Sequence, residues 1–239
     1  GHEQRAKEIA DLLGQTVAAR EQYLAADMIA SGLTRAAAPG HSADPAQNGS
    51  IDFAAHPVIT HPVAYGAKLR MELPHGISIG KIHGELIDIL SKDISGFPAE
   101  SAEERAKRLF LYLFFALKKR LRNENVGGLG GLWDVLPADT RIPDHSIWSH
   151  IALASAVGSS LREDETGAIS LAVFSITPVQ PFIARARKLR DNWVGSVLLS
   201  YLAFTGIRHI SETLGPDHIV YPSLHDQSLV EKWAGRSFG

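Results

Sequence analysis

The segment Pro137–Ala156, PADTRIPDHSIWSHIALASA, places an aspartate, two histidines and a tryptophan where its apolar residues predict the start of a buried helix. At about 100° per residue, one face of that helix carries Ile147, Trp148, Ile151, Ala154 and Ser155. His150 lies beside this face, and His145 falls on roughly the opposite side. The spacing therefore does not give the i, i+4 histidine pair with which a single helix binds a metal ion.

Asp144 directly precedes His145 and belongs to a residue type that commonly caps helix N-termini. Two interpretations follow. In the first, Asp144 is a cap and His150 is a hydrogen-bonded core histidine, and the spacing alone favours this one. In the second, His145 binds a metal ion from the helix entrance, and its other ligands come from other helices.

Other polar residues stand in apolar or irregular surroundings. Asp27 lies in LAADMIAS, an apolar helical stretch, and a buried carboxylate needs a cation or a metal as its partner. Taken alone, this pattern favours an exposed aspartate. His56 and His61 lie in HPVITHP, which its prolines exclude from regular helix, so both are predicted to be loop residues.

The composition limits the kinds of chemistry. The 239 residues include no cysteine, which excludes disulfides, thiolate zinc sites and cysteine nucleophiles, so a metal site here must use histidine and carboxylate ligands. A net charge of −2 argues against wholesale coating of nucleic acid. No run of about 18 apolar residues is present, so we expect no membrane span and no membrane partner. The lack of cysteine suits a reducing cytoplasm.

Helical spacing and punctuation residues divide the first part of the chain. Ser101 and Glu104 form a capping-box pattern ahead of the most apolar run, LFLYLFFAL at 109–117, which we predict to be a buried helix. The glycines of NVGGLGGL end that helix, and they lack the Lys-Ser/Thr ending of a phosphate loop. The remaining predictions are helical residues over 3–35, 78–92 and 145–157 and a surface loop over 36–50.

The character of the chain changes after a polar linker, and we place a domain boundary at 160–167. AISLAVFSI at 168–176 is a β-rich run, two helices are predicted over 179–214, and HIVYPSL at 218–224 predicts a second strand. This β-α-α-β order is the start of a mixed sheet domain that the chain does not complete. Its helices have an apolar and a basic side, which suits either packing on the sheet or a nucleotide or partner surface where arginines meet phosphate.

Two long motifs carry a resemblance to a known family. SITPVQPFIARARKLRDNWVGSVLLSYLA, with GPDHIVYPSLHDQSLVEKW after it, closely resembles the large subunit of type III-B (Cmr) CRISPR effector complexes, at the opening of its first palm domain. PADTRIPDHSIWSHIALASA, GHEQRAKEIADLLG and AADMIAS resemble the HD-type domain that precedes it. The resemblance implies an N-terminal fragment of an α+β protein: a mainly helical HD-like domain at 1–162, then the beginning of a ferredoxin-like, cyclase-related palm domain at 167–239.

The resemblance also implies activities and partners. In the family, the HD domain cuts single-stranded DNA with a divalent metal (Mn, Ni or Mg), and two palm domains convert ATP with Mg into cyclic oligoadenylates. The subunit acts in a cytoplasmic complex with other Cmr subunits, CRISPR RNA and target RNA. We therefore expect this chain to be part of such an RNA-guided antiviral effector.

The resemblance nominates site residues one by one. HD enzymes hold metal with a histidine, a His-Asp pair and a further aspartate. DHS resembles the segment with the lone histidine, which nominates His145, and ADMIAS resembles the segment with the last aspartate, which nominates Asp27. Asp144 and His150 are expected on the metal or DNA side of the same site. The nucleotide-binding candidates of the palm domain are Gln180, Arg190, Ser196 and Ser200.

The chain also departs from the family pattern. Its only His-Asp pair, His225-Asp226, lies in the part that resembles the palm, and the Gly-Gly-Asp-Asp motif of the second palm is absent. We therefore expect neither a complete nuclease nor a complete cyclase in this polypeptide alone. Two alternatives stay open: a stand-alone HD-type metal-dependent nucleotide phosphohydrolase, and a catalytically inactive assembly module.

Overall fold

The computed structural model describes residues 2–15, 20–34, 53, 55, 57–61, 63–64, 66–98, 101–139, 143–161 and 169–238. The loop predicted at 36–50 lies outside the described residues, as does His56. Contacts between Cα atoms divide the chain into two compact units, and the division falls between Gly158 and Ser159. Each unit is mainly helical, and a two-stranded sheet is present in the first, which confirms an α+β chain at this coarse level.

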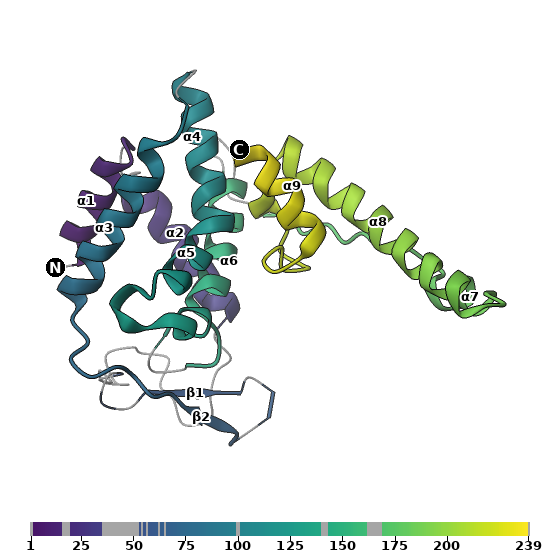
Figure 1. The fold of residues 1–239 in the computed structure, drawn as a ribbon, viewed down its shortest axis with the longest axis horizontal. Coiled ribbons are helices and arrows are strands. Elements are labelled where there is room, and N and C mark those ends of the chain that lie inside the picture. The colour runs from purple at the N-terminus through teal and green to yellow at the C-terminus, as the bar shows by residue number, and fades with distance from the viewer. Residues whose placement is uncertain are drawn as a thin grey trace. The chain divides into compact units, whose positions relative to one another are not determined.

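The first unit contains a set of helices and one short hairpin (Figure 1). The helices are α1 (His2–Leu12), α2 (Arg20–Thr34), α3 (Ile79–Ser95), α4 (Ala102–Leu111), the π-helix η2 (Tyr112–Ala116), α5 (Leu117–Asn123), the short η3 (Val126–Gly128) and η4 (Gly130–Asp134), and α6 (Ile147–Ser160). Strands β1 (Val58–Thr60) and β2 (Lys68–Arg70) pair antiparallel, with Ile59 opposite Leu69. The sequence predicted that the segment of β1 is not helical, but it did not predict this hairpin.

The core of the first unit forms where α1, α3 and α4 bring their apolar stripes together. Its buried residues are Leu13, Leu90, Ile94, Leu109 and Tyr112. The predicted helix starts are confirmed by their caps: Ser78 Oγ accepts from the Lys81 N–H at 3.5 Å, and Ser101 Oγ accepts from the Glu104 N–H at 3.1 Å. The helix predicted at 109–117 is present, with a π-helical turn inside it; Leu109 and Tyr112 are buried, and its other residues are half-buried.

The glycine-rich segment after α5 makes a tight contact with α3. Gly127 has φ +64°, a conformation in which residues with a Cβ are strained, and its N–H donates to Glu85 Oε2 at 2.6 Å. A Cβ at this position would lie 2.5 Å from Ile82 Cγ1. The sequence interpretation of these glycines as turn residues is therefore correct, and the turn also fixes α3 against η3.

Replacing Gly127 by alanine is expected to destabilise the first unit by about 1–3 kcal/mol, because the new methyl group overlaps Ile82 and the backbone is strained. Hydrogen exchange of the α3 and α5 amides measures this change. Gly131→Ala is the matched control: Gly131 is exposed, its φ is not in the left-handed region, and nothing lies within 4 Å of the position that its methyl group would take. Equal hydrogen-exchange protection in Gly127→Ala and Gly131→Ala would contradict the close contact between Gly127 and Ile82.

The second unit is built on one long helix. It contains α7 (Val179–Ala184), α8 (Leu189–Thr213), η5 (Pro216–His218) and α9 (Ser228–Phe238). Trp233 Nε1 of α9 donates to Glu212 Oε1 of α8 at 3.0 Å, and Ser159 Oγ donates to the buried Asp217 at 2.5 Å. The prediction of two helices over 179–214 is confirmed.

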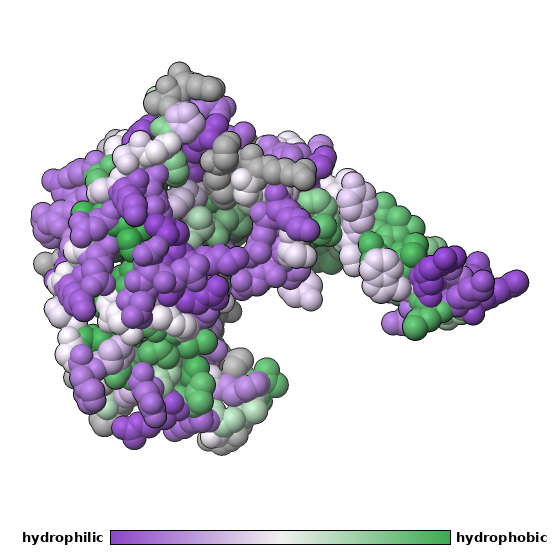
Figure 2. Space-filling view, in the orientation of Figure 1, coloured by the Kyte–Doolittle hydropathy of each residue, from purple (hydrophilic) through white to green (hydrophobic). Residues whose placement is uncertain are grey.

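The two strands predicted for this unit are wrong. Residues 169–178 and 219–220 have no regular secondary structure, and 218–224 contains no strand. A β-rich run specifies an extended backbone, but a strand also needs a hydrogen-bonded neighbour. No neighbouring strand is present among the described residues of this unit, so Val173 remains 88% exposed. Figure 2 shows that apolar residues, drawn green, are also exposed along α8.

No helix in the described parts of the chain is both long enough and apolar enough to span a membrane. The longest, α8, has 25 residues, and it carries charged residues such as Arg190, Asp191 and Arg208.

Candidate functional site

The candidate site begins at the N-terminal end of α6. Hydrogen bonds from the Ala138 N–H to the His145 carbonyl (3.1 Å) and from the Ile147 N–H to the Leu136 carbonyl (2.8 Å) fix the backbone there. The helix starts at Ile147, two residues later than the sequence predicts. Ser146 is its cap, because its hydroxyl accepts from the Ser149 N–H at 3.2 Å. The interpretation of Asp144 as the N-cap is therefore wrong.

Asp144 instead binds its neighbour. The distance from its Oδ1 to His145 Nδ1 is 2.6 Å, and both side chains are about one-sixth exposed. With the proton on Nδ1 donated to the carboxylate, Nε2 of His145 is the acceptor nitrogen that remains for a ligand. Metal-binding histidines are commonly oriented by a carboxylate in this way.

The second pair joins two helices that are distant in sequence. His150 Nε2 of α6 lies 2.8 Å from Asp27 Oδ1 of α2. His150 is nearly buried, whereas 54% of the Asp27 side chain is exposed. The centroids of the His145 and His150 rings are 6.2 Å apart. The structure thus brings all four nominated metal-site residues into one cluster.

Small residues and a tryptophan hold this cluster in place. Ala26 and Ala30, one turn apart on α2, are buried, and a Cβ on Gly158 of α6 would lie only 3.6 Å from Ala26 Cβ. This close approach sets Asp27 beside His150. On the other side of α6, Trp148 Nε1 donates to the Trp133 carbonyl of η4 at 2.5 Å, which anchors the start of the helix.

The cluster has the chemistry of a metal site but not a complete ligand set. Two imidazoles and two carboxylates suit divalent ions such as Mn²⁺ or Ni²⁺. Yet among the described residues no three histidine or acidic side chains are arranged to hold a metal ion. The four residues form two hydrogen-bonded pairs. The atoms that these two hydrogen bonds do not use include His145 Nε2 and the second carboxylate oxygen of Asp27. These residues therefore offer two donor atoms to a metal ion, and they do not by themselves complete a metal site.

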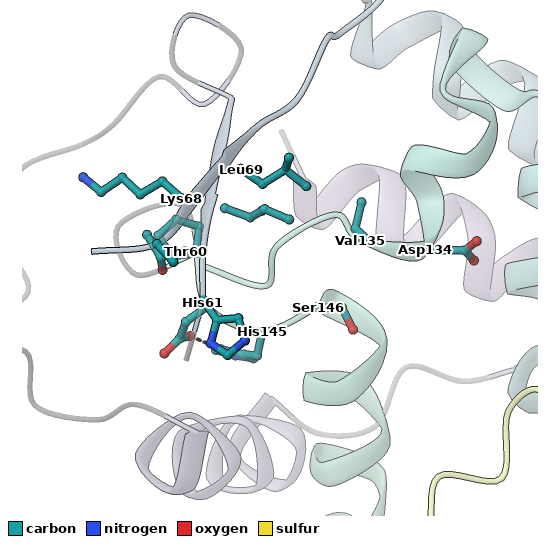
Figure 3. A pocket seen from close by; sticks show the side chains of 12 residues that line it. Thr60, His61, Lys68, Leu69, Asp134, Val135, His145 and Ser146 are labelled. Carbon is teal, nitrogen blue, oxygen red and sulfur yellow. Dashed lines mark hydrogen bonds and ion pairs between the residues drawn. The ribbon is translucent and has the colours of Figure 1, made fainter. Parts of the chain in front are cut away.

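A cavity of about 430 Å³ opens beside His145 (Figure 3). Its walls come from the β1–β2 hairpin, the end of η4 and the segment that leads into α6. His61 follows β1 in the loop of the hairpin, as the sequence predicted, and it is among the lining residues. Its place in the cavity depends on the pairing of β1 with β2, which the sequence did not predict.

The four nucleotide-binding candidates lie in the second unit. Gln180 is on α7, and Arg190, Ser196 and Ser200 are on α8. Ser196 and Ser200 lie one turn apart, and the Ser196 hydroxyl donates to the Asn192 carbonyl at 3.2 Å. The four residues are spread over two helices, so their role in nucleotide binding stays a prediction. His225-Asp226 lies in a turn before α9, in a different unit from His145 and Asp27.

Comparisons with known proteins find one family. The family model described as "CRISPR-associated protein Cmr2, N-terminal" matches residues 171–238. The CRISPR system Cmr subunit Cmr2 of Pyrococcus furiosus is 30% identical over 223 residues, which cover 80% of this chain and 24% of that protein. The Cmr2 subunit of Saccharolobus solfataricus is 37% identical over 91 residues, covering 37% of this chain and 8% of that protein. No solved structure gives a significant match.

The chain thus spans about a quarter or less of the length of these curated relatives. The match to the Pyrococcus protein covers more of the chain than the second unit alone contains, so the likeness extends into the first unit. The resemblance found in the sequence motifs is confirmed: this chain belongs to the Cmr2 family, the large subunits of CRISPR Cmr systems, and matches its N-terminal part.

Proposed function

We propose that this chain works in a cytoplasmic, RNA-guided CRISPR effector complex and that its first unit contributes to a divalent-metal site for cleaving single-stranded DNA. The observation that carries this proposal is the cluster of Asp27, Asp144, His145 and His150. Asp27 and His150 are separated by 123 positions in sequence, yet they are in hydrogen-bond contact. The curated relatives are named as Cmr subunits, which supports partners among other Cmr subunits. CRISPR RNA and target RNA are further partners that the family resemblance implies.

Each residue of the cluster has a distinct role in this proposal. His145 would hold the metal through Nε2, and Asp144 would fix the tautomer and orientation of its ring. Asp27 would use the oxygen that does not contact His150. A divalent cation (Mn, Ni or Mg) at such a site supplies positive charge that activates water and stabilises a phosphodiester under attack. The remaining ligands come from outside the described residues.

For the second unit, the proposal follows the family resemblance. Gln180, Arg190, Ser196 and Ser200 would face ATP with Mg in a palm-type site for cyclic oligoadenylate synthesis. Arg190 suits this role because a guanidinium binds phosphate oxygens in pairs. The unit supplies no complete sheet among its described residues, so this activity depends on parts of the subunit beyond them.

One observation favours the alternative of an assembly module. Large apolar side chains of α8 are exposed within the second unit, among them Trp193, Tyr201 and Leu202. Faces of this kind are usually covered by other protein in an assembly. The stand-alone phosphohydrolase is less well supported, because the match to a Cmr2 subunit extends over 80% of the chain.

Binding of Mn²⁺ by the full-length protein tests the metal site directly. Asp27→Asn is expected to weaken Mn²⁺ binding, measured by calorimetric titration, by about tenfold or more, because it removes an anionic oxygen but keeps the hydrogen bond to His150. Asp88→Asn, an exposed position on α3, is the matched control and should bind like the wild type. Unchanged binding by Asp27→Asn would remove Asp27 from the ligand set, and a wild-type protein that binds no Mn²⁺ would refute the metal site.

A further inference from the structure

The cavity beside His145 is formed by three segments of the first unit. The hairpin supplies Thr60, His61 and Leu69, the end of η4 supplies Val135, and the segment before α6 supplies Asp144 and His145. A hydrogen bond from the Thr60 N–H to the Pro143 carbonyl, 2.8 Å, ties the hairpin to the last of these segments. The walls are therefore fixed to the same backbone that positions the candidate metal site.

Two exposed apolar side chains form part of the cavity walls. Leu69 is 60% exposed and Val135 is 39% exposed, and Figure 3 shows both directed into the space between the hairpin and the loop after η4. In the same view the Lys68 side chain extends away from this space, and the Asp134 carboxylate turns away from it. Asp134 is compensated by Lys118 at 3.5 Å and by Arg122 at 3.0 Å. The exposed side chains of Leu69 and Val135 can therefore pack against the face of a flat ligand.

The polar groups of the cavity lie at one end. Nδ1 of His61 accepts hydrogen bonds from the Val63 N–H (3.1 Å) and the Ala64 N–H (2.9 Å). Because Nδ1 is an acceptor, the proton of the neutral ring is on Nε2, which is therefore a donor. The Asp144 carboxylate, which also binds His145 Nδ1, supplies an acceptor. This end can bind the donors and acceptors on the edge of a heterocyclic base.

We propose that this cavity holds one nucleobase of a single-stranded DNA, unstacked from its neighbours, beside the candidate metal site. The inference rests on the proposed function for the identity of the strand. A volume of about 430 Å³ falls within the range of roughly 300–1,000 Å³ typical of small-molecule pockets. The base lies against Leu69 and Val135 with its edge toward His61. Its phosphate then comes close to His145, where cleavage is proposed to occur.

This arrangement favours a single strand over a duplex as the ligand. A base in a duplex must be unpaired and unstacked before it enters such a cavity, which costs a few kcal/mol, whereas a flexible single strand pays little of that cost. Apolar contact with the base face is tolerant of sequence, because every base has such a face. Binding is therefore expected to prefer single strands over duplex and to show weak sequence preference.

The experiment measures binding of a fluorescein-labelled single-stranded DNA 10-mer to the full-length protein in EDTA, by fluorescence anisotropy. Val135→Trp fills the cavity and is expected to weaken binding by about tenfold. Val63→Trp is the matched control, because Val63 is 86% exposed on the same hairpin and does not line the cavity. It should bind like the wild type. Equal affinity of the two variants would overturn the proposal.

A second measurement changes the DNA and leaves the protein intact. A 10-mer of abasic nucleotides keeps the phosphates but has no bases, and it is expected to bind the wild type at least about tenfold more weakly than the ordinary 10-mer. Equal binding of the two strands would overturn the cavity proposal. A 2-aminopurine base in the strand should also change its fluorescence with the wild type and with Val63→Trp, but not with Val135→Trp.

Removing the metal with EDTA separates this proposal from the nuclease proposal. A protein that binds the strand through the cavity but cleaves no DNA in Mn²⁺ supports the base pocket and refutes the nuclease. If the wild type and Val135→Trp cleave DNA at the same rate and bind it with the same affinity, the nuclease proposal stands and the base pocket is refuted.

Discussion

Replacing His145 by alanine in the full-length protein is expected to reduce Mn²⁺-dependent cleavage of single-stranded DNA by at least about 100-fold, or about 2.7 kcal/mol of transition-state stabilisation. The reason is geometric. His145 is the histidine whose second nitrogen is held by Asp144 at 2.6 Å, so its Nε2 is positioned for a ligand. The rate is measured by electrophoresis of a 5′-labelled strand under single-turnover conditions.

Two variants make this result specific. His75→Ala changes an exposed histidine in the turn before α3 and should leave the rate unchanged. Asp144→Asn keeps the size of the side chain but weakens the orientation of the His145 ring, and a loss of about tenfold is expected. Full activity in His145→Ala would place any nuclease activity elsewhere in the protein and would favour the assembly module.

The start of α6 shows how far local sequence rules reach. The sequence predicts a helix here, because a helix depends on spacing within a few residues. Its predicted apolar face is not the buried one: Ile151 is 50% exposed, and the buried residues of α6 are Ala156 and Val157.

The sequence does not distinguish Asp144 from Ser146 as the cap, since both residue types cap helices well. Which of the two residues is the cap depends on the backbone conformation before Ile147. The hydrogen bond from the Ala138 N–H to the His145 carbonyl fixes that conformation, and Ala138 lies outside the helix.

The cluster itself depends on packing between helices that are distant in sequence. From spacing alone, Asp27 was predicted to be exposed and His150 to be a core histidine. Only the family resemblance predicted that both belong to one site. Their 2.8 Å contact follows from the close approach of α2 and α6 at Ala26 and Gly158. No local pattern in the sequence records which two helices will meet.

At 168–176, by contrast, a local pattern predicts an element that the structure does not form. Its composition predicts a strand, but the structure has none over the described residues 169–176, because a strand is completed by a partner and not by propensity. The hairpin of β1 and β2 was missed for a related reason: its strands have three residues each, which is too short for an alternating pattern to be recognised.

The other large effect is expected at Asp93 of α3, which lies at the centre of a partly buried hydrogen-bond network. The Tyr112 hydroxyl donates to Asp93 Oδ2 at 2.6 Å, and Arg120 donates to both carboxylate oxygens, at 2.8 and 2.9 Å. The π-helix η2 begins at Tyr112, and Arg120 follows it in α5. The network therefore joins α3 to the start of η2 and to α5.

Asp93→Ala is expected to lower the free energy of unfolding of the first unit by about 2–3 kcal/mol, because it leaves the Tyr112 hydroxyl without its acceptor and leaves Arg120 with Glu124 alone. Hydrogen exchange of the α3, α4 and α5 amides measures the change in this unit separately from the other one. Asp88→Ala, an exposed position on the same helix, is the control and should change stability by less than about 0.5 kcal/mol.

The pH dependence of this difference identifies its electrostatic origin. Burial raises the pKa of Asp93, but the hydrogen bonds from Arg120 and Tyr112 outweigh burial and hold the pKa below its ordinary value of 3.8. A carboxylate with a lowered pKa in the folded state stabilises the protein above the unfolded-state pKa, and that contribution is lost as the pH falls through the folded-state pKa. The stability difference between the wild type and Asp93→Ala should therefore be constant near neutral pH and shrink as the pH falls below 3.8. A difference that stays the same in acid would mean that Asp93 acts through packing and not through its charge.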